Sequence, residues 1–84
     1  MPCVKTIDSI RICIYSRDHN PPHFHVLISK YEELIRIEDF ENYSGSIPTK
    51  YRKKVIEWAV LNQGFLWTTW KLLNKKNESC KKNT

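Results

Sequence analysis

The chain has 84 residues, 40% of them hydrophobic and 12% aromatic, which suffices for one core but not for two domains of the usual roughly 100 to 200 residues. Its formal net charge of +5 favours an acidic partner, either nucleic acid or a protein. No apolar run approaches the roughly 20 residues that span a bilayer, and the first residues lack a signal-peptide pattern, so we expect a cytoplasmic protein without a membrane partner.

The first half of the chain carries the alternation of apolar and polar residues that is typical of half-buried strands. It is clear over residues 10–15 and 23–28 and continues over 33–37. A short first strand over 4–7 and a weak one over 40–43 extend the pattern. One face of the predicted sheet would therefore be buried, with a core containing Ile12, Ile14, Phe24, Val26 and Ile35.

The second half changes to a helical period. Pro48 suits the first turn of a helix, which we expect over residues 48–62, and a second helix is predicted over 65–74. The sequence therefore predicts an α+β fold: a small curved antiparallel sheet of three to five strands, followed by two C-terminal helices packed on one face. We expect a single domain over residues 1–74 and a basic, disordered tail over 75–84.

The cysteines give a prediction about the redox environment. Cys3, Cys13 and Cys80 are odd in number, lie far apart in the sequence and form no C-x-x-C pair. We therefore expect neither a disulfide framework nor a zinc knuckle, and a reducing compartment fits best.

The segment from Asp18 to His25 is rich in histidine and contains two adjacent prolines. His23 and His25 point to the same side of a strand, and His19 lies four residues upstream of His23. Three interpretations stay open: ligands for a divalent metal such as zinc, an acid–base pair at a phosphodiester, or hydrogen bonds to the backbone of the turn. The structural interpretation is favoured and no cofactor is expected, because no carboxylate or cysteine cluster accompanies the histidines.

Residues 12–26 resemble the signature of a family of short bacterial proteins, domain-of-unknown-function family 4160 (DUF4160). The resemblance continues through residues 44–48 and through Trp58, Asn62, Leu66 and Trp70 of the predicted helices. It implies a small cytoplasmic protein, often encoded beside a member of family 2442, which is thought to bind DNA. The pair is suspected of forming toxin–antitoxin or regulatory modules, so a family 2442-type protein is a candidate partner.

These observations lead to three hypotheses about function. The first is a binding or regulatory protein that presents one face of its sheet to a partner protein or nucleic acid, or to a second copy in a homodimer. The second is a metal-independent ribonuclease in which His23 and His25 act as acid and base, and Arg11 or Arg36 stabilises developing negative charge. The third is a metal-binding protein, most plausibly for zinc, with His19, His23 and His25 as ligands. The candidate binding residues are Arg11, Tyr15, Asp18, His19, His23, His25, Arg36, Lys50, Lys53 and Lys54.

Overall fold

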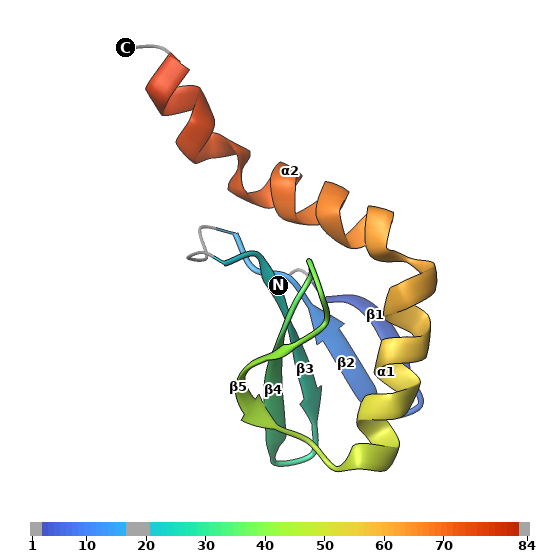
Figure 1. Cartoon of the computed structure of the whole chain (residues 1–84). Helices are drawn as coiled ribbons and strands as arrows, with labels where there is room; N and C mark the ends of the chain where they lie inside the picture. The colour runs from blue at the N-terminus through green and yellow to red at the C-terminus, as the bar shows by residue number, and fades with distance from the viewer. Residues whose placement is uncertain (1–2, 17–20, 83–84) are drawn as a thin grey trace.

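A computed structural model describes residues 3–16 and 21–82, with side chains described as far as Asn74. Five strands come first and two helices follow, and the strands pair antiparallel with their chain neighbours (Figure 1). This arrangement confirms the expected α+β fold. The elements are β1 (Cys3–Ile7), β2 (Ile10–Cys13), β3 (His23–Ile28), β4 (Tyr31–Arg36), β5 (Asn42–Ser46), α1 (Thr49–Leu61) and α2 (Gln63–Lys82).

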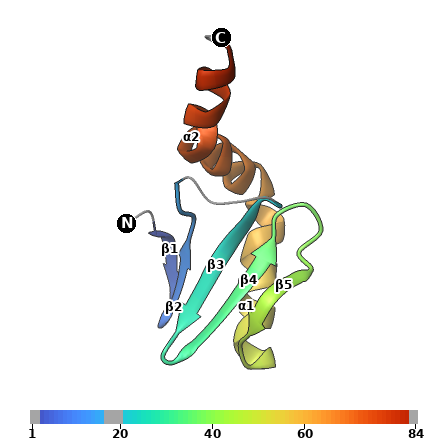
Figure 2. The ribbon, with the colours of Figure 1, turned by 90° about the vertical axis from the view of Figure 1, so that its left-hand side faces the viewer.

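One face of the sheet is buried, as the alternation predicts. α1 lies behind the sheet in Figure 2 and covers this face. Its buried residues Val55 and Ala59 join the apolar side chains of the strands in one cluster. The strand residues of that cluster with no exposed surface are Ile10, Ile12, Phe24, Val26 and Ile35.

The observed boundaries of β2, β4 and β5 differ from the predicted ones by two residues or more at one or both ends. β2 ends at Cys13 rather than at residue 15, and β4 already begins at Tyr31. β5 starts at Asn42, later than the weak strand predicted over 40–43. The reason for the last difference is a turn in which the Phe40 amide donates to the Arg36 carbonyl oxygen, at 2.9 Å. This turn occupies the residues that the sequence assigned to the start of the strand.

α1 matches its predicted bounds within one residue at each end. Pro48 takes the position before the helix, and the amides of Tyr51 and Arg52 both donate to its carbonyl oxygen. At the other end the amide of Asn62 donates to the Ala59 carbonyl oxygen, and its side chain donates to that of Trp58. Asn62 therefore ends α1 where the sequence placed the break.

α2 differs more from the prediction. It begins at Gln63, crosses over one end of the sheet instead of lying flat on its face, and continues to Lys82 (Figures 1 and 2). The sequence placed its end at residue 74. Adding a residue to an existing helix costs much less than starting one, and the lysines beyond residue 74 are good helix formers. Within the described part of the chain, no helix is both long and apolar enough to cross a membrane.

The prediction about the cysteines is wrong for two of them. Cys3 and Cys13 are register partners across β1 and β2 and form a disulfide. They are ten residues apart in the sequence, and the tight turn between the two strands brings them opposite each other. Asp8 supplies the positive φ of 55° at this turn.

Candidate binding face

The face of the sheet opposite α1, called the open face below, carries side chains in rows across β2, β3 and β4. In the pairing of β2 with β3, Arg11 lies opposite Leu27 and Cys13 lies opposite His25. Successive residues of a strand point to opposite faces, so every second residue belongs to this face. Its members on these three strands are Arg11, Cys13, His23, His25, Leu27, Glu32, Leu34 and Arg36. The sequence therefore grouped four of its candidate residues on the correct face.

His23 is enclosed at the end of this face that lies next to α2. It has no exposed surface, and its Nδ1–H donates to the carbonyl oxygen of Pro21 at 2.7 Å. A carbonyl oxygen only accepts, so the proton lies on Nδ1. The ring also lies 5.2 Å from the ring of Tyr43 on β5 and 5.5 Å from that of Trp70 on α2. His23 thus joins the loop before β3, the edge strand and α2, as the structural interpretation expects.

His25 lies two residues further along β3, on the same face, and is less enclosed. Its side chain is 12% exposed, and Nδ1–H donates to Oε2 of Glu32 at 3.1 Å. The ring meets that of Tyr15 edge to face, with centroids 4.4 Å apart, and lies 5.1 Å from the ring of His23. Tyr15 and His25 therefore form the half-buried centre of the open face, beside the exposed carboxylate of Glu32.

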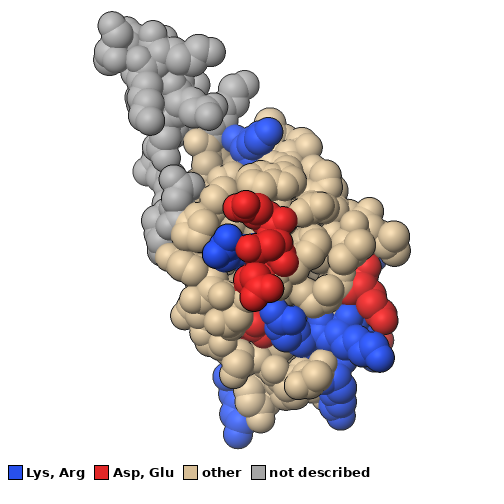
Figure 3. Space-filling model, viewed as in Figure 1, with Lys and Arg blue, Asp and Glu red and all other residues tan. Residues whose placement is uncertain are grey.

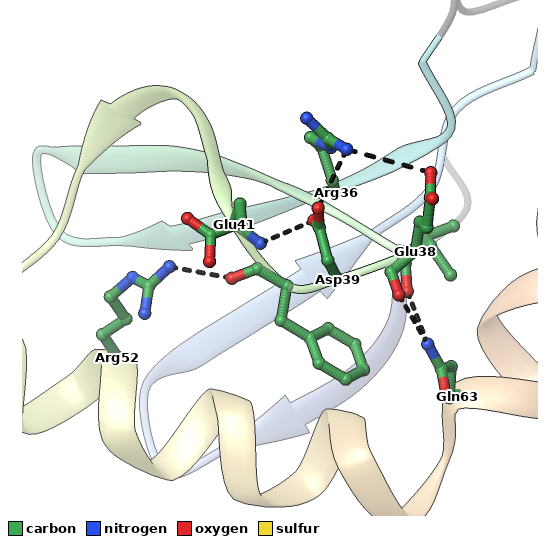
Figure 4. A network of polar contacts seen from close by, with 8 residues as sticks. Arg36, Glu38, Asp39, Glu41, Arg52 and Gln63 are labelled. Carbon is green, nitrogen blue, oxygen red and sulfur yellow. Dashed lines mark hydrogen bonds and ion pairs between the residues drawn. The ribbon is translucent and has the colours of Figure 1, made fainter.

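Arg36 is engaged by acidic residues of the turn that follows β4. One of its terminal nitrogens, Nη2, lies 2.9 Å from Asp39 Oδ2 and 3.8 Å from Glu38 Oε1 (Figure 4). The turn is itself held by the start of α2, because the Gln63 side chain donates to the carbonyl oxygens of Ile37 and Glu38, at 2.8 and 3.2 Å. Arg36 is therefore directed at this turn.

The remaining charged candidates lie on opposite sides of the sheet. Arg11 is exposed on β2, whereas Lys50, Lys53 and Lys54 lie on α1, on the other side of the sheet. The Lys54 ammonium lies 2.9 Å from the Asp8 carboxylate, which raises the pKa of Lys54 above its ordinary value by hydrogen bonding and charge attraction. Lys50 lies over the ring of its neighbour Tyr51, 5.0 Å from the centroid. The structure therefore separates the helix lysines from the histidines.

Asp18 and His19 lie outside the described residues, so the proposed three-histidine metal site is not seen whole. Over residues 3–16 and 21–74, the structure has no group of three or more His, Cys, Asp or Glu side chains arranged to hold a metal ion. His23 and His25 are the two candidates whose geometry is described.

Sequence reasoning missed a buried ionic group on the core face. Glu33 is only 2% exposed, and its Oε2 accepts from Arg52 Nε at 2.9 Å and from Asn42 Nδ2 at 3.0 Å. Its other oxygen, Oε1, is buried and has no hydrogen-bond partner among the described residues. Arg52 also donates to the Phe40 carbonyl oxygen at 3.1 Å (Figure 4). The sequence contained a signal for this burial, because Glu33 lies two residues before the buried Ile35 and their side chains therefore point to the same face of the strand.

Arg52 and its exposed or half-buried neighbours on α1 line a hollow of about 400 Å³. It is an open depression along a single helix, and its walls are Thr49, Arg52, Lys53, Ile56 and Glu57. No pattern in the sequence predicted this hollow.

Fold and face together define a small α+β protein with an open five-stranded sheet, one face of which is covered by a helix. The family model described as a domain of unknown function, DUF4160, matches residues 9–71, well over half of the chain. The chain belongs to this family. No curated protein and no solved structure matches it.

Proposed function

We propose that this chain is a non-enzymatic binding protein that contacts a partner protein through its open face, as one component of a toxin–antitoxin-like or regulatory pair. One observation carries the proposal: α1 covers the core face, while the middle of the open face combines half-buried apolar and exposed charged side chains. Leu27 and Leu34 supply the apolar part, and Arg11 and Glu32 the charged part. Such a mixture, with an apolar centre and a polar rim, is characteristic of protein interfaces.

The charges of this face favour a protein over nucleic acid. A phosphate backbone is bound by Lys and Arg side chains that are available to neutralise it. On the open face Arg36 is paired with Asp39, and His25 with Glu32. Beyond this face, Figure 3 shows Asp and Glu side chains in a central group and in a second group at the right, each next to Lys or Arg side chains. The paired charges of the open face suit a complementary protein surface better than a polyanion.

The geometry also favours binding over catalysis. In the ribonuclease hypothesis two imidazoles exchange protons with the substrate, so both must reach it. His23 has no exposed surface, and its Nδ1–H donates a hydrogen bond to the carbonyl oxygen of Pro21. The guanidinium of Arg36, expected to stabilise negative charge, is held by Asp39. These contacts indicate that His23 and Arg36 have structural roles.

The partner that the family resemblance suggests is a family 2442-type protein, and an affinity measurement tests it. The chain is mixed with a family 2442-type protein, and the dissociation constant is measured for the native chain and for Arg11→Glu and Leu34→Glu. We expect each substitution to weaken binding by about 10- to 100-fold, since both residues would lie in the interface. Lys53→Glu on α1 is the matched control and should leave the affinity within about twofold.

Other outcomes identify other functions. Equal affinities for all three variants would show that the open face is not the interface. A homodimer that Leu34→Glu dissociates, seen by sedimentation, would mean that a second copy covers this face. Binding of an RNA or DNA oligonucleotide that is lost in Lys53→Glu and kept in Leu34→Glu would favour nucleic acid. Zinc at one ion per chain by elemental analysis, lost in His25→Ala, would favour the metal hypothesis.

A further inference from the structure

The disulfide between Cys3 and Cys13 lies at the edge of the sheet and joins the edge strand β1 to β2. β1 is an edge strand, on which Cys3 is exposed, whereas Cys13 on β2 has no exposed surface. The β1–β2 register shifts between Cys3 and Lys5, directly beside the disulfide. A register shift interrupts the ladder of backbone hydrogen bonds. The disulfide therefore joins this end of β1 to the sheet covalently at the point where the backbone ladder is irregular, next to the packing of Val4 against the core.

We propose that Cys3 and Cys13 form a reversible redox latch that fastens the start of β1 to the sheet. In the open state both side chains are thiols. A low-molecular-weight disulfide closes the latch: the thiolate of the exposed Cys3 attacks one of its sulfurs, and one thiol leaves. The thiolate of Cys13 then attacks Cys3 in this mixed disulfide and displaces the second thiol. The pair loses two protons and two electrons, and the oxidant is reduced to two thiols.

The position of the latch gives it a structural consequence. Once the bond is reduced, the irregular start of this edge strand keeps only noncovalent contacts, which are its pairing with β2 and the packing of the half-buried Val4 against the core. Movement of this segment uncovers Cys13, which lies directly opposite His25 on the open face. Reduction therefore changes the border of that face. The latch itself does not depend on whether the face binds a partner.

Amide hydrogen exchange on oxidised and reduced protein tests the latch directly. The full chain carries Cys80→Ser, which leaves Cys3 and Cys13 as its only cysteines, and is equilibrated with either glutathione disulfide or reduced glutathione. We expect the amides of residues 3–7 to exchange at least about tenfold faster in the reduced protein, under conditions in which local opening rather than global unfolding governs their exchange. The melting temperature should fall by roughly 10 °C, because the bond closes a ten-residue separation.

Alkylation and a matched variant complete the experiment. The oxidised chain, unfolded and treated with iodoacetamide, should gain no alkyl group, and the reduced chain should gain two. Cys3→Ser in the same background should exchange like the reduced protein in both buffers. Two alkyl groups on the oxidised chain, or a disulfide-linked dimer, would overturn the pairing. A disulfide that forms without changing exchange in residues 3–7 would overturn the latch.

Discussion

Gly45 shows how a single residue can be fixed by its surroundings. It adopts a φ of +70°, and a Cβ atom built on it would lie 2.3 Å from the backbone oxygen of Glu32 on the neighbouring strand. A residue with a side chain at this position would suffer both backbone strain and a steric clash with this oxygen. Gly64, the other glycine, has open space around the position of a Cβ atom.

The two glycines therefore predict opposite results for the same substitution. Gly45→Ala should lower the free energy of unfolding by about 2 kcal/mol or more, since it adds the strain of a positive φ to a contact with backbone. Gly64→Ala should be neutral or stabilise by up to about 1 kcal/mol, because alanine favours a helix more than glycine does. Chemical denaturation measures both. Equal effects would show that the close approach of β5 to Glu32 is wrong.

At the scale of elements, the buried carboxylate of Glu33 joins β4 to α1 through Arg52. Removing one partner of such a pair leaves an uncompensated buried charge, whereas replacing both with apolar residues removes the charge altogether. Arg52→Ala should therefore lower the free energy of unfolding by about 2 to 4 kcal/mol. The lower part of the range applies because the Arg52 side chain is 32% exposed.

A double variant separates the ionic contribution from packing. Glu33→Leu combined with Arg52→Met should recover most of the loss, and Lys53→Ala, on the exposed side of the same helix, should stay within about 0.5 kcal/mol of the native chain. A double variant as unstable as Arg52→Ala would mean that packing by Arg52, rather than its charge, stabilises the contact between strand and helix.

The elements that the sequence predicted well are those set by local patterns. The alternation over residues 23–28 gives β3 at its observed bounds, and Pro48 and Asn62 mark the two ends of α1. What the sequence missed depends on register. Cys3 and Cys13 meet only because the turn at Asp8 aligns β1 with β2. Similarly, the enclosure of His23 requires Tyr43 and Trp70, which come from distant parts of the chain.

The candidate site was predicted in part for the same reason. Alternation placed Arg11, His23, His25 and Arg36 on one face, as the register confirms. It could not show that His23 is buried or that Arg36 is paired with Asp39, because both depend on a turn and on contacts between elements.

For the whole molecule, we expect that the purified chain does not cleave RNA. His23 is enclosed and Arg36 is paired, so these groups are not positioned to act on a phosphodiester. A labelled RNA incubated with excess native protein should stay intact when followed by gel electrophoresis. The contrary result is cleavage that falls by roughly 10²- to 10⁴-fold in His23→Ala or His25→Ala, in variants shown to be folded by circular dichroism.

The central claim is that the open face contacts a partner protein, and nuclear magnetic resonance maps this contact directly. The backbone amide signals of the chain are followed while the family 2442-type protein is added. We expect the signals of Arg11, His25, Leu27 and Leu34 to shift or broaden first. The signals of Lys50 and Lys53 on α1 should change little. Changes concentrated on α1, with the first four signals constant under saturating partner, would contradict the claim.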